Sequence, residues 1–313
     1  MHAAAFSPRE GVSPRSARLR GQSIIEYVLI IAIIGLVIVF AGPGVAGAIR
    51  NQFNQVTNTV DSGTDGDSFI SAEEKAYREA MKTVVNKDAK DWTLDEQKAA
   101  ATDIAKNGTS SVVYAKAKAA MEAGTKFSAK LTNGKTLEYR IVGINHDDLA
   151  DGSGKAGLTF EATNTALSTQ RMNATDTNAG GWEKSELRGR LNSGDLWSLL
   201  PSELQSKVKS VKKMTDNKGG GTAGTPSATT DKVFLLSSTE VWGDLDHDGT
   251  QYEYYKSKGV TRSNYSGASS SDYHWTRSVY PSDSTLFRLI FSGGDWGNYS
   301  ATNTYYVFPA FSF

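Results

Sequence analysis

An uncharged apolar run near the N-terminus constrains this 313-residue chain more than any other feature. Residues 27–49 carry no charge, and about 20 apolar residues in a helix are enough to cross a bilayer. Residues 1–20 contain four arginines and a single acid, a bias that predicts a cytoplasmic N-terminus. The sequence therefore predicts a single pass through the cytoplasmic membrane, with the C-terminal bulk of the chain outside.

One carboxylate, Glu26, stands at the start of this run, where burial in hydrocarbon is costly unless a positive charge neutralises it. Cleavage between Gly21 and Gln22 would create an α-amino group one helical turn from Glu26. The stretch GQSIIEYVLI resembles the N-terminus of Flp/Tad-type (type IVb) prepilins, with Gly21 before the cut, Glu26 at the fifth mature position and Tyr27 at the sixth. A cleaved signal peptide, with A-G-A at 46–48, is the alternative.

The prepilin resemblance implies a leader at 1–21 and a transmembrane assembly helix at 22–60. Its implied partners are a prepilin peptidase, which acts between Gly21 and Gln22, and other pilin subunits, which pack through Glu26 and Tyr27. After export, the protein would lie at the cell surface or in a pilus.

Residues 61–124 predict a linker followed by a small helical stalk. Ser71 followed by Glu74, and Thr93 followed by Glu96, are capping-box patterns that begin helices. The tract before Ser71 also alternates acids in the manner of a calcium loop. It lacks the required first Asp and sixth Gly, so a helix cap is the better interpretation.

Residues 125–313 differ from residues 61–124 in composition and pattern, which predicts a separate domain. Asn133 and Gly134 stand between two alternating apolar runs, a strong hairpin pattern, and the final residues predict a strand within a sheet. The ordered segments YRIVGINHD, GGWEKSELRGRLN, LLPSEL, TDKVFLLSSTEVWG, QYEYY, WTRS and VFPAFSF resemble a bacterial family of uncharacterised C-type-lectin-like domains akin to formylglycine-generating enzymes. The predicted fold class is α+β, with an N-terminal transmembrane pilin helix, a helical spacer and this C-type-lectin-like domain.

Catalysis is not expected, because the chain has no cysteine and neither a G-x-S-x-G nor an H-E-x-x-H motif. His146 is followed by two aspartates, but adjacent residues at a strand end rarely face one another. The formal net charge of +0 argues against a nucleic-acid partner. Four large side chains are predicted to be core residues: Trp182, Trp242, Trp275 and Arg277.

The segment DLDHDGTQYEYY is the best metal candidate, because Asp244, Asp246 and Asp248 alternate before Gly249. The twelfth position is Tyr255, where an EF-hand needs Glu. A Ca2+ loop and a hydrated acidic turn therefore remain equal alternatives, and no other cofactor is expected.

Two C-terminal tracts, RSNYSGASSSDYHW and SGGDWGNYSATNTYY, have the Tyr, Ser, Gly and Asn composition of antibody paratopes. This composition predicts contacts with a protein or glycan ligand. Solvent-exposed loops that bind no ligand are almost as good an interpretation. The second tract also resembles the diversified C-terminal loop in variable proteins of diversity-generating retroelements. The candidate ligand-binding residues are Tyr265, Tyr273, Asp295, Trp296, Asn298, Tyr299, Asn303 and Tyr305.

Together, these features predict a minor or tip subunit of a Flp/Tad-type pilus that presents a lectin-like head for adhesion. One alternative is a structural minor pilin that primes or caps filament assembly. The other is a membrane-anchored surface enzyme with an unrecognised site.

Overall fold

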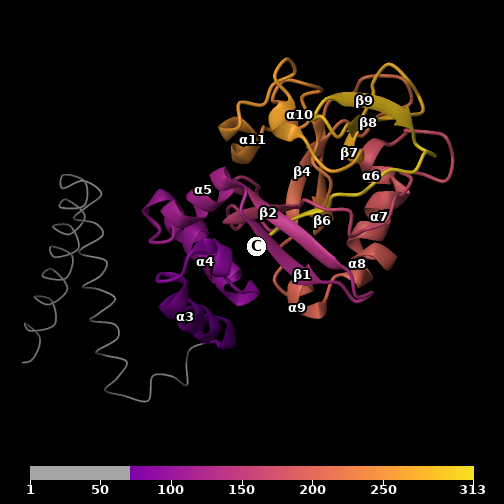
Figure 1. The fold of residues 1–313 in the computed structure, drawn as a ribbon. Helices are drawn as coiled ribbons and strands as arrows, with labels where there is room; N and C mark the ends of the chain where they lie inside the picture. Colours follow the sequence, from indigo (N-terminus) through magenta and orange to yellow (C-terminus); the bar gives the residue numbers. More distant parts are fainter. Residues whose placement is uncertain (1–70) are drawn as a thin grey trace, which may run out of the picture. The chain divides into compact units, whose positions relative to one another are not determined.

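The computed structural model describes residues 71–313, which Figure 1 shows in colour. No helix within this range could span a membrane, and the longest of them, α4 (Leu94–Asn107), has only 14 residues. The predicted fold class is therefore corrected to α+β without a membrane helix in residues 71–313, and the predicted single-pass membrane localisation is corrected on the same finding. The predictions that lie outside the described residues are the leader 1–21, the helix 22–60, Gly21, Gln22, Glu26 and Tyr27.

The described part begins with three helices, α3 (Ala72–Val84), α4 and α5 (Tyr114–Ala123). Short 3-10 turns, Ala89–Asp91 and Gly108–Ser110, lie between them. The Ser71 hydroxyl accepts a hydrogen bond from the Glu74 amide at 3.1 Å, which caps α3. Thr93 and Glu96 form both halves of the capping box that begins α4. The two helix starts predicted from the sequence are thus confirmed.

Helix α5 packs on β2 (Thr136–Ile144), α4 packs on β3 (Leu158–Ala162), and α3 packs on α4 (Figure 1). Strand β1 (Lys126–Lys130) begins just after α5, close to the predicted boundary at residue 124. Gly157 lies so near α4 that a Cβ atom there would be 1.8 Å from the Ala101 carbonyl oxygen. The Tyr139 hydroxyl donates to Gln97 Oε1 at 3.0 Å. The helices and the sheet therefore belong to one compact unit.

The main sheet has five strands in the order β1-β2-β3-β10-β6. The remaining strands are β2 (Thr136–Ile144), β3 (Leu158–Ala162), β6 (Val233–Phe234) and β10 (Ala310–Ser312). Gly134 closes the predicted β1–β2 hairpin with φ 84°. The C-terminal strand β10 is antiparallel to both β3 and β6, so the last residues do enter a sheet, as predicted. Phe160 and Phe311 stack across this junction with ring centroids 5.6 Å apart.

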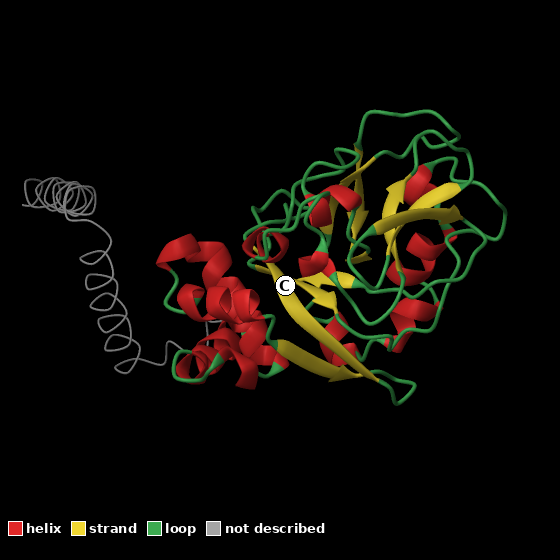
Figure 2. Cartoon of the chain, turned by 45° about the horizontal axis from the view of Figure 1, so that its top comes forward, coloured by secondary structure: helices red, strands yellow, loops and turns green. Residues whose placement is uncertain are grey.

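Two smaller sheets complete the domain (Figure 2). One pairs β4 (Val211–Thr215) with β5 (Ser227–Asp231), and the other contains β7 (His274–Val279), β8 (Leu286–Ile290) and β9 (Trp296–Ser300). Strand β9 lies within a tract that the sequence predicted as a loop, because Gly297 and Asn298 are poor strand formers. The short helices are α6 (Gly181–Lys184), α7 (Glu186–Asn192), α8 (Asp195–Leu199), α9 (Ser202–Gln205), α10 (Ser238–Trp242) and α11 (Glu253–Ser257).

Candidate functional site

Four aromatic rings form a closed group at the surface of the β7–β8–β9 sheet, and we call this group the tyrosine patch. Tyr273 lies 4.8 Å from Phe291 and 6.5 Å from Tyr305, measured between ring centroids. Tyr299 lies 6.1 Å from Phe291 and 5.0 Å from Tyr305. Three of the eight predicted ligand-binding residues are thus brought together. Phe291 was missed, because an apolar residue at the end of a strand pattern is indistinguishable from a core residue.

Each ring of the tyrosine patch comes from a different segment of the chain. Tyr273 precedes β7, Phe291 follows β8, Tyr299 lies on β9, and Tyr305 lies in the segment after β9. The β8–β9 pairing sets Tyr299 opposite Phe287. A reciprocal pair of backbone hydrogen bonds, at 2.7 and 3.0 Å, holds Tyr305 beside residue 170. Because backbone pairing positions these segments, the rings form a preorganised surface.

The tyrosine patch lies on a buried floor and presents hydroxyl groups. Trp275 is only 1% exposed, and its ring lies 5.1 Å from that of Tyr305. Tyr273, by contrast, is 42% exposed. Burial raises the pKa of Tyr305, and the neighbouring Tyr299 hydroxyl raises it further by charge and hydrogen bonding. The patch thus combines apolar ring surface with phenolic hydroxyl groups.

The other predicted ligand-binding residues lie apart from this ring group. Trp296 packs against Trp242 at 5.8 Å, and the Arg262 guanidinium lies 5.7 Å from the Trp296 ring. Tyr265 is 38% exposed and makes no ring contact with the patch.

Two of the three remaining polar candidates use their side chains within the domain, and the third is held through its backbone. Asn298 Oδ1 accepts a hydrogen bond from Arg288 Nη1 at 3.0 Å, and the Asp295 carboxylate accepts one from the Trp296 amide. The Asn303 amide donates to the Ser300 carbonyl at 2.9 Å, which closes a turn at the exposed end of β9.

The three aspartates of the predicted calcium loop do not converge. Asp246 forms a bidentate pair with Arg288, with two N–O distances of 2.7 Å. Asp248 is fully buried and accepts from the Asp216 amide at 2.9 Å, whereas Asp244 is exposed. No group of three potential metal-ligating side chains exists within residues 71–313. The calcium-loop prediction therefore does not hold for these residues, because Arg288 of the same domain pairs with Asp246, the central carboxylate.

Beneath this loop lies a buried ionic network, formed by Asp147, Lys213, Glu240 and Arg277. The Lys213 ammonium lies 2.5 Å from Asp147 and 2.6 Å from Glu240. Arg277 Nη2 lies 2.8 Å from Glu240, and the two side chains also pair through Nη1. Burial alone would raise the pKa of Asp147, but Lys213 holds that pKa at about 2. The two cations and two anions compensate each other, so removal of any one of them would leave an uncompensated buried charge.

His146 pairs with Glu253 across the entrance to this network. The Nδ1 atom lies 3.1 Å from both carboxylate oxygens of Glu253, and the ring lies 4.1 Å from that of Tyr252. These residues border a polar cavity of about 320 Å³. His146 is thus paired with an acid 107 positions away in sequence, and not with either of the two aspartates that follow it directly.

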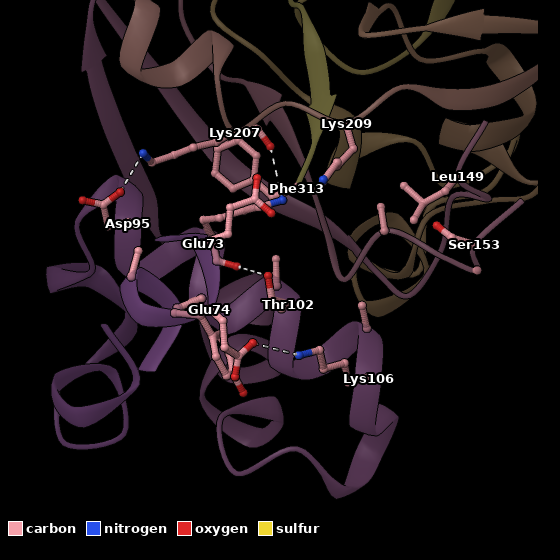
Figure 3. A pocket seen from close by; sticks show the side chains of 18 of the residues that line it. Glu73, Glu74, Asp95, Thr102, Lys106, Leu149, Ser153, Lys207, Lys209 and Phe313 are labelled. Atoms are coloured by element: carbon pink, nitrogen blue, oxygen red, sulfur yellow. Dashed lines mark hydrogen bonds and ion pairs between the residues drawn. The ribbon is translucent and has the colours of Figure 1, made fainter. Parts of the chain in front are cut away.

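A larger cleft of about 760 Å³ lies beside α3 and α4, and Figure 3 shows its lining. We call it the lysine cleft, after Lys98, Lys207 and Lys209. Lys207 pairs with Asp95 at 2.6 Å. Burial and the positive charges of Lys209 and Lys207 lower the pKa of Lys98 to about 8, although Glu73 acts in the opposite direction.

Comparison with known proteins yields one family. No curated protein and no solved structure matches the chain. A family model described as a domain of unknown function, DUF6273, matches residues 154–313. The match covers most of the predicted C-terminal domain, and its description names neither a pilin nor a lectin, so both of those resemblances remain predictions. Since the model spans half of the sequence, the chain belongs to the DUF6273 family.

Proposed function

We propose that residues 125–313 form a non-catalytic recognition domain that binds a protein partner through the tyrosine patch. One observation carries the proposal: four rings from separate segments form a closed group at the surface, and Tyr273 within it is 42% exposed. Single exposed aromatic residues are common, but contiguous apolar groups with polar surroundings are typical of interaction sites.

The chemistry of the tyrosine patch suits protein recognition. Tyrosine is enriched at the energetic centres of interfaces because it offers a large apolar ring and one hydrogen-bonding group. Serine, glycine and asparagine flank these aromatic residues in the sequence, as in paratopes. The rings are already held in place by neighbouring rings and by backbone pairing, so binding would cost little side-chain entropy.

The adjacent sheet edge favours a protein over a glycan. Strand β9 is an edge strand, and no strand of residues 71–313 pairs with its outer side. An extended segment of a partner protein could add to this edge while its side chains contact the tyrosine patch. Assembly into a pilus concerns residues 1–60, which lie outside the described part, and remains a prediction from the sequence.

The full-length chain tests the proposal when it is screened against arrays of surface proteins and of glycans. For each hit, we expect Tyr273→Ala and Tyr299→Ala to weaken binding by roughly thirtyfold, the typical effect at an interface centre. Tyr265→Ala is the matched control, because Tyr265 is 38% exposed but lies outside the ring group.

Equal losses in Tyr273→Ala and Tyr265→Ala would refute a role for the tyrosine patch. Hits that are all glycans, with losses confined to the patch variants, would keep the site but overturn the protein partner. If every hit binds Tyr273→Ala and Tyr299→Ala as well as it binds the wild type, the proposal is overturned entirely.

A further inference from the structure

The lysine cleft shares no lining residue with the tyrosine patch. It lies between α3, α4, the loop after β2 and the segment that precedes β4, and Phe313 closes one side (Figure 3). Its volume of about 760 Å³ falls in the range of small-molecule sites. The cleft can therefore be considered as a second, independent site.

Positive charge in the lysine cleft is only partly balanced. Lys207 is paired with Asp95, and Lys106 approaches Glu74 at 3.9 Å. Among residues 71–313, neither Lys98 nor Lys209 forms a salt bridge with a carboxylate. The charged groups that line the cleft, from all elements around it, are Glu73, Glu74, Asp95, Lys98, Lys106, Lys155, Lys207 and Lys209.

The lysines at the cleft repel one another. Lys98 is half-buried on α4, and apart from burial its largest neighbouring influence is the charge of Lys209. Its ammonium makes one long hydrogen bond, at 3.4 Å, to the Lys207 carbonyl oxygen. A bound anion would relieve this repulsion and give Lys98 and Lys209 the partners that they lack.

Part of the lining is apolar. Tyr77, Ala105 and Leu149 expose apolar surface to the cleft, and the buried side chains of Ala99, Ala101, Ala156 and Phe313 lie behind it. A fully hydrated inorganic ion would leave this surface uncovered. An anion with a hydrocarbon or aromatic body would use both parts of the lining.

We propose that the lysine cleft binds a small organic dianion, with its charged group at Lys98 and Lys209 and its apolar body against Tyr77, Ala105 and Leu149. A phosphate monoester and a dicarboxylate share this chemistry. Two probes distinguish these sources: phenyl phosphate and isophthalate, with phenol as the uncharged control.

Isothermal titration calorimetry with the full-length chain at pH 7.5 tests the proposal. We expect one or both dianions to bind, and phenol not to bind. Lys98→Met keeps the apolar stem and removes the charge, so it should weaken binding about ten- to a hundredfold. Lys98→Arg should restore most of the affinity. Lys135→Met, at an exposed lysine in the β1–β2 turn, is the matched control and should bind normally.

The pH dependence gives a second readout. Because binding favours the charged ammonium, affinity should fall as pH rises from 7 to 9, through the pKa of Lys98 near 8. Phenyl phosphate keeps its charge in this range. Binding of phenyl phosphate alone assigns the site to phosphate esters, and binding of isophthalate alone assigns it to dicarboxylates. Absence of binding by both probes, or equal binding by Lys98→Met, would overturn the proposal.

Discussion

The buried ionic network and the tyrosine patch use polar side chains in opposite ways. In the network, the charged groups of Lys213 and Arg277 are paired with Asp147, Glu240 and backbone carbonyls of the domain itself. In the patch, Tyr273 is exposed and the other three rings are half-buried at the surface. The difference teaches that charge is a poor guide to function in this domain. Asp246, at the centre of the acidic motif that most resembled a site, is already paired with Arg288, whereas tyrosines without net charge form the available surface.

The largest expected effect is the loss of the central anion of the network. Glu240→Gln leaves Lys213 and Arg277 buried with one carboxylate fewer between them. We expect the free energy of unfolding to fall by about 3–5 kcal/mol, the usual cost of breaking a buried ion pair. Urea denaturation measures this change.

Glu138→Gln provides the control for that measurement. Glu138 pairs with Lys126 at 2.8 Å, but both side chains are at least 41% exposed. Such a pair contributes less than about 1 kcal/mol. Similar losses for the two variants would remove the distinction between a structural interior network and ordinary surface pairs.

The second prediction concerns pH. Burial raises the pKa of Asp248 from 3.8 to about 6, and Arg277 only partly offsets this effect. The folded protein therefore binds more protons than the unfolded chain between these values, so this group lowers stability as pH rises from 4 to 6. A shift of this size corresponds to about 3 kcal/mol at neutral pH.

Asp248→Asn should remove that loss. The stability difference between variant and wild type should grow in favour of the variant from pH 4 to pH 7, as followed by urea denaturation. A constant difference over this range would show that Asp248 is not protonated in the folded protein. The lowered pKa of Asp147 acts in the opposite direction at more acidic pH, and it cancels in the comparison.

The third prediction tests the corrected calcium loop. Asp246→Asn breaks the bidentate pair with Arg288, so we expect a loss of about 1.5–3 kcal/mol. Added calcium chloride should leave the Tm of the wild type unchanged. A calcium-dependent rise in Tm that Asp246→Asn abolishes would contradict the conclusion that Asp246 has a structural role and does not bind calcium.

The smallest effect is expected in the tyrosine patch. Tyr273→Ala removes a ring that is 42% exposed, so stability should change by less than about 1 kcal/mol. Thermal unfolding measures this change, and Tyr265→Ala serves as its control at similar exposure. A large loss for Tyr273→Ala alone would mean that the patch stabilises the sheet, and its proposed role in binding would weaken.

Local features of the fold could be predicted from the sequence. The hairpin at Gly134 and the helix start at Thr93 depend on residues within a few positions of each other. The burial of Trp182, Trp242 and Trp275 follows from the size and apolar character of indole rings, and all three are at most 1% exposed.

Features that depend on distant partners could not be predicted. Asp246 is 42 positions from Arg288, and nothing near Asp246 indicates that its charge is already neutralised. The tyrosine patch was predicted only in composition, since the ring group exists because β8 and β9 pair. Strand β9 itself forms despite weak propensity, because pairing along its whole length outweighs local preference.

The central position of β10 has a consequence for synthesis of the protein. Strand β3 ends at Ala162, but its neighbour on that side begins only at Ala310. At ribosomal rates of about 5–20 residues per second, β3 waits on the order of 10 s for this neighbour. During that interval, an apolar strand with Phe160 at its centre has an open edge outside the ribosome. The nascent chain is therefore expected to depend on chaperone binding to this segment, a dependence that the finished fold conceals.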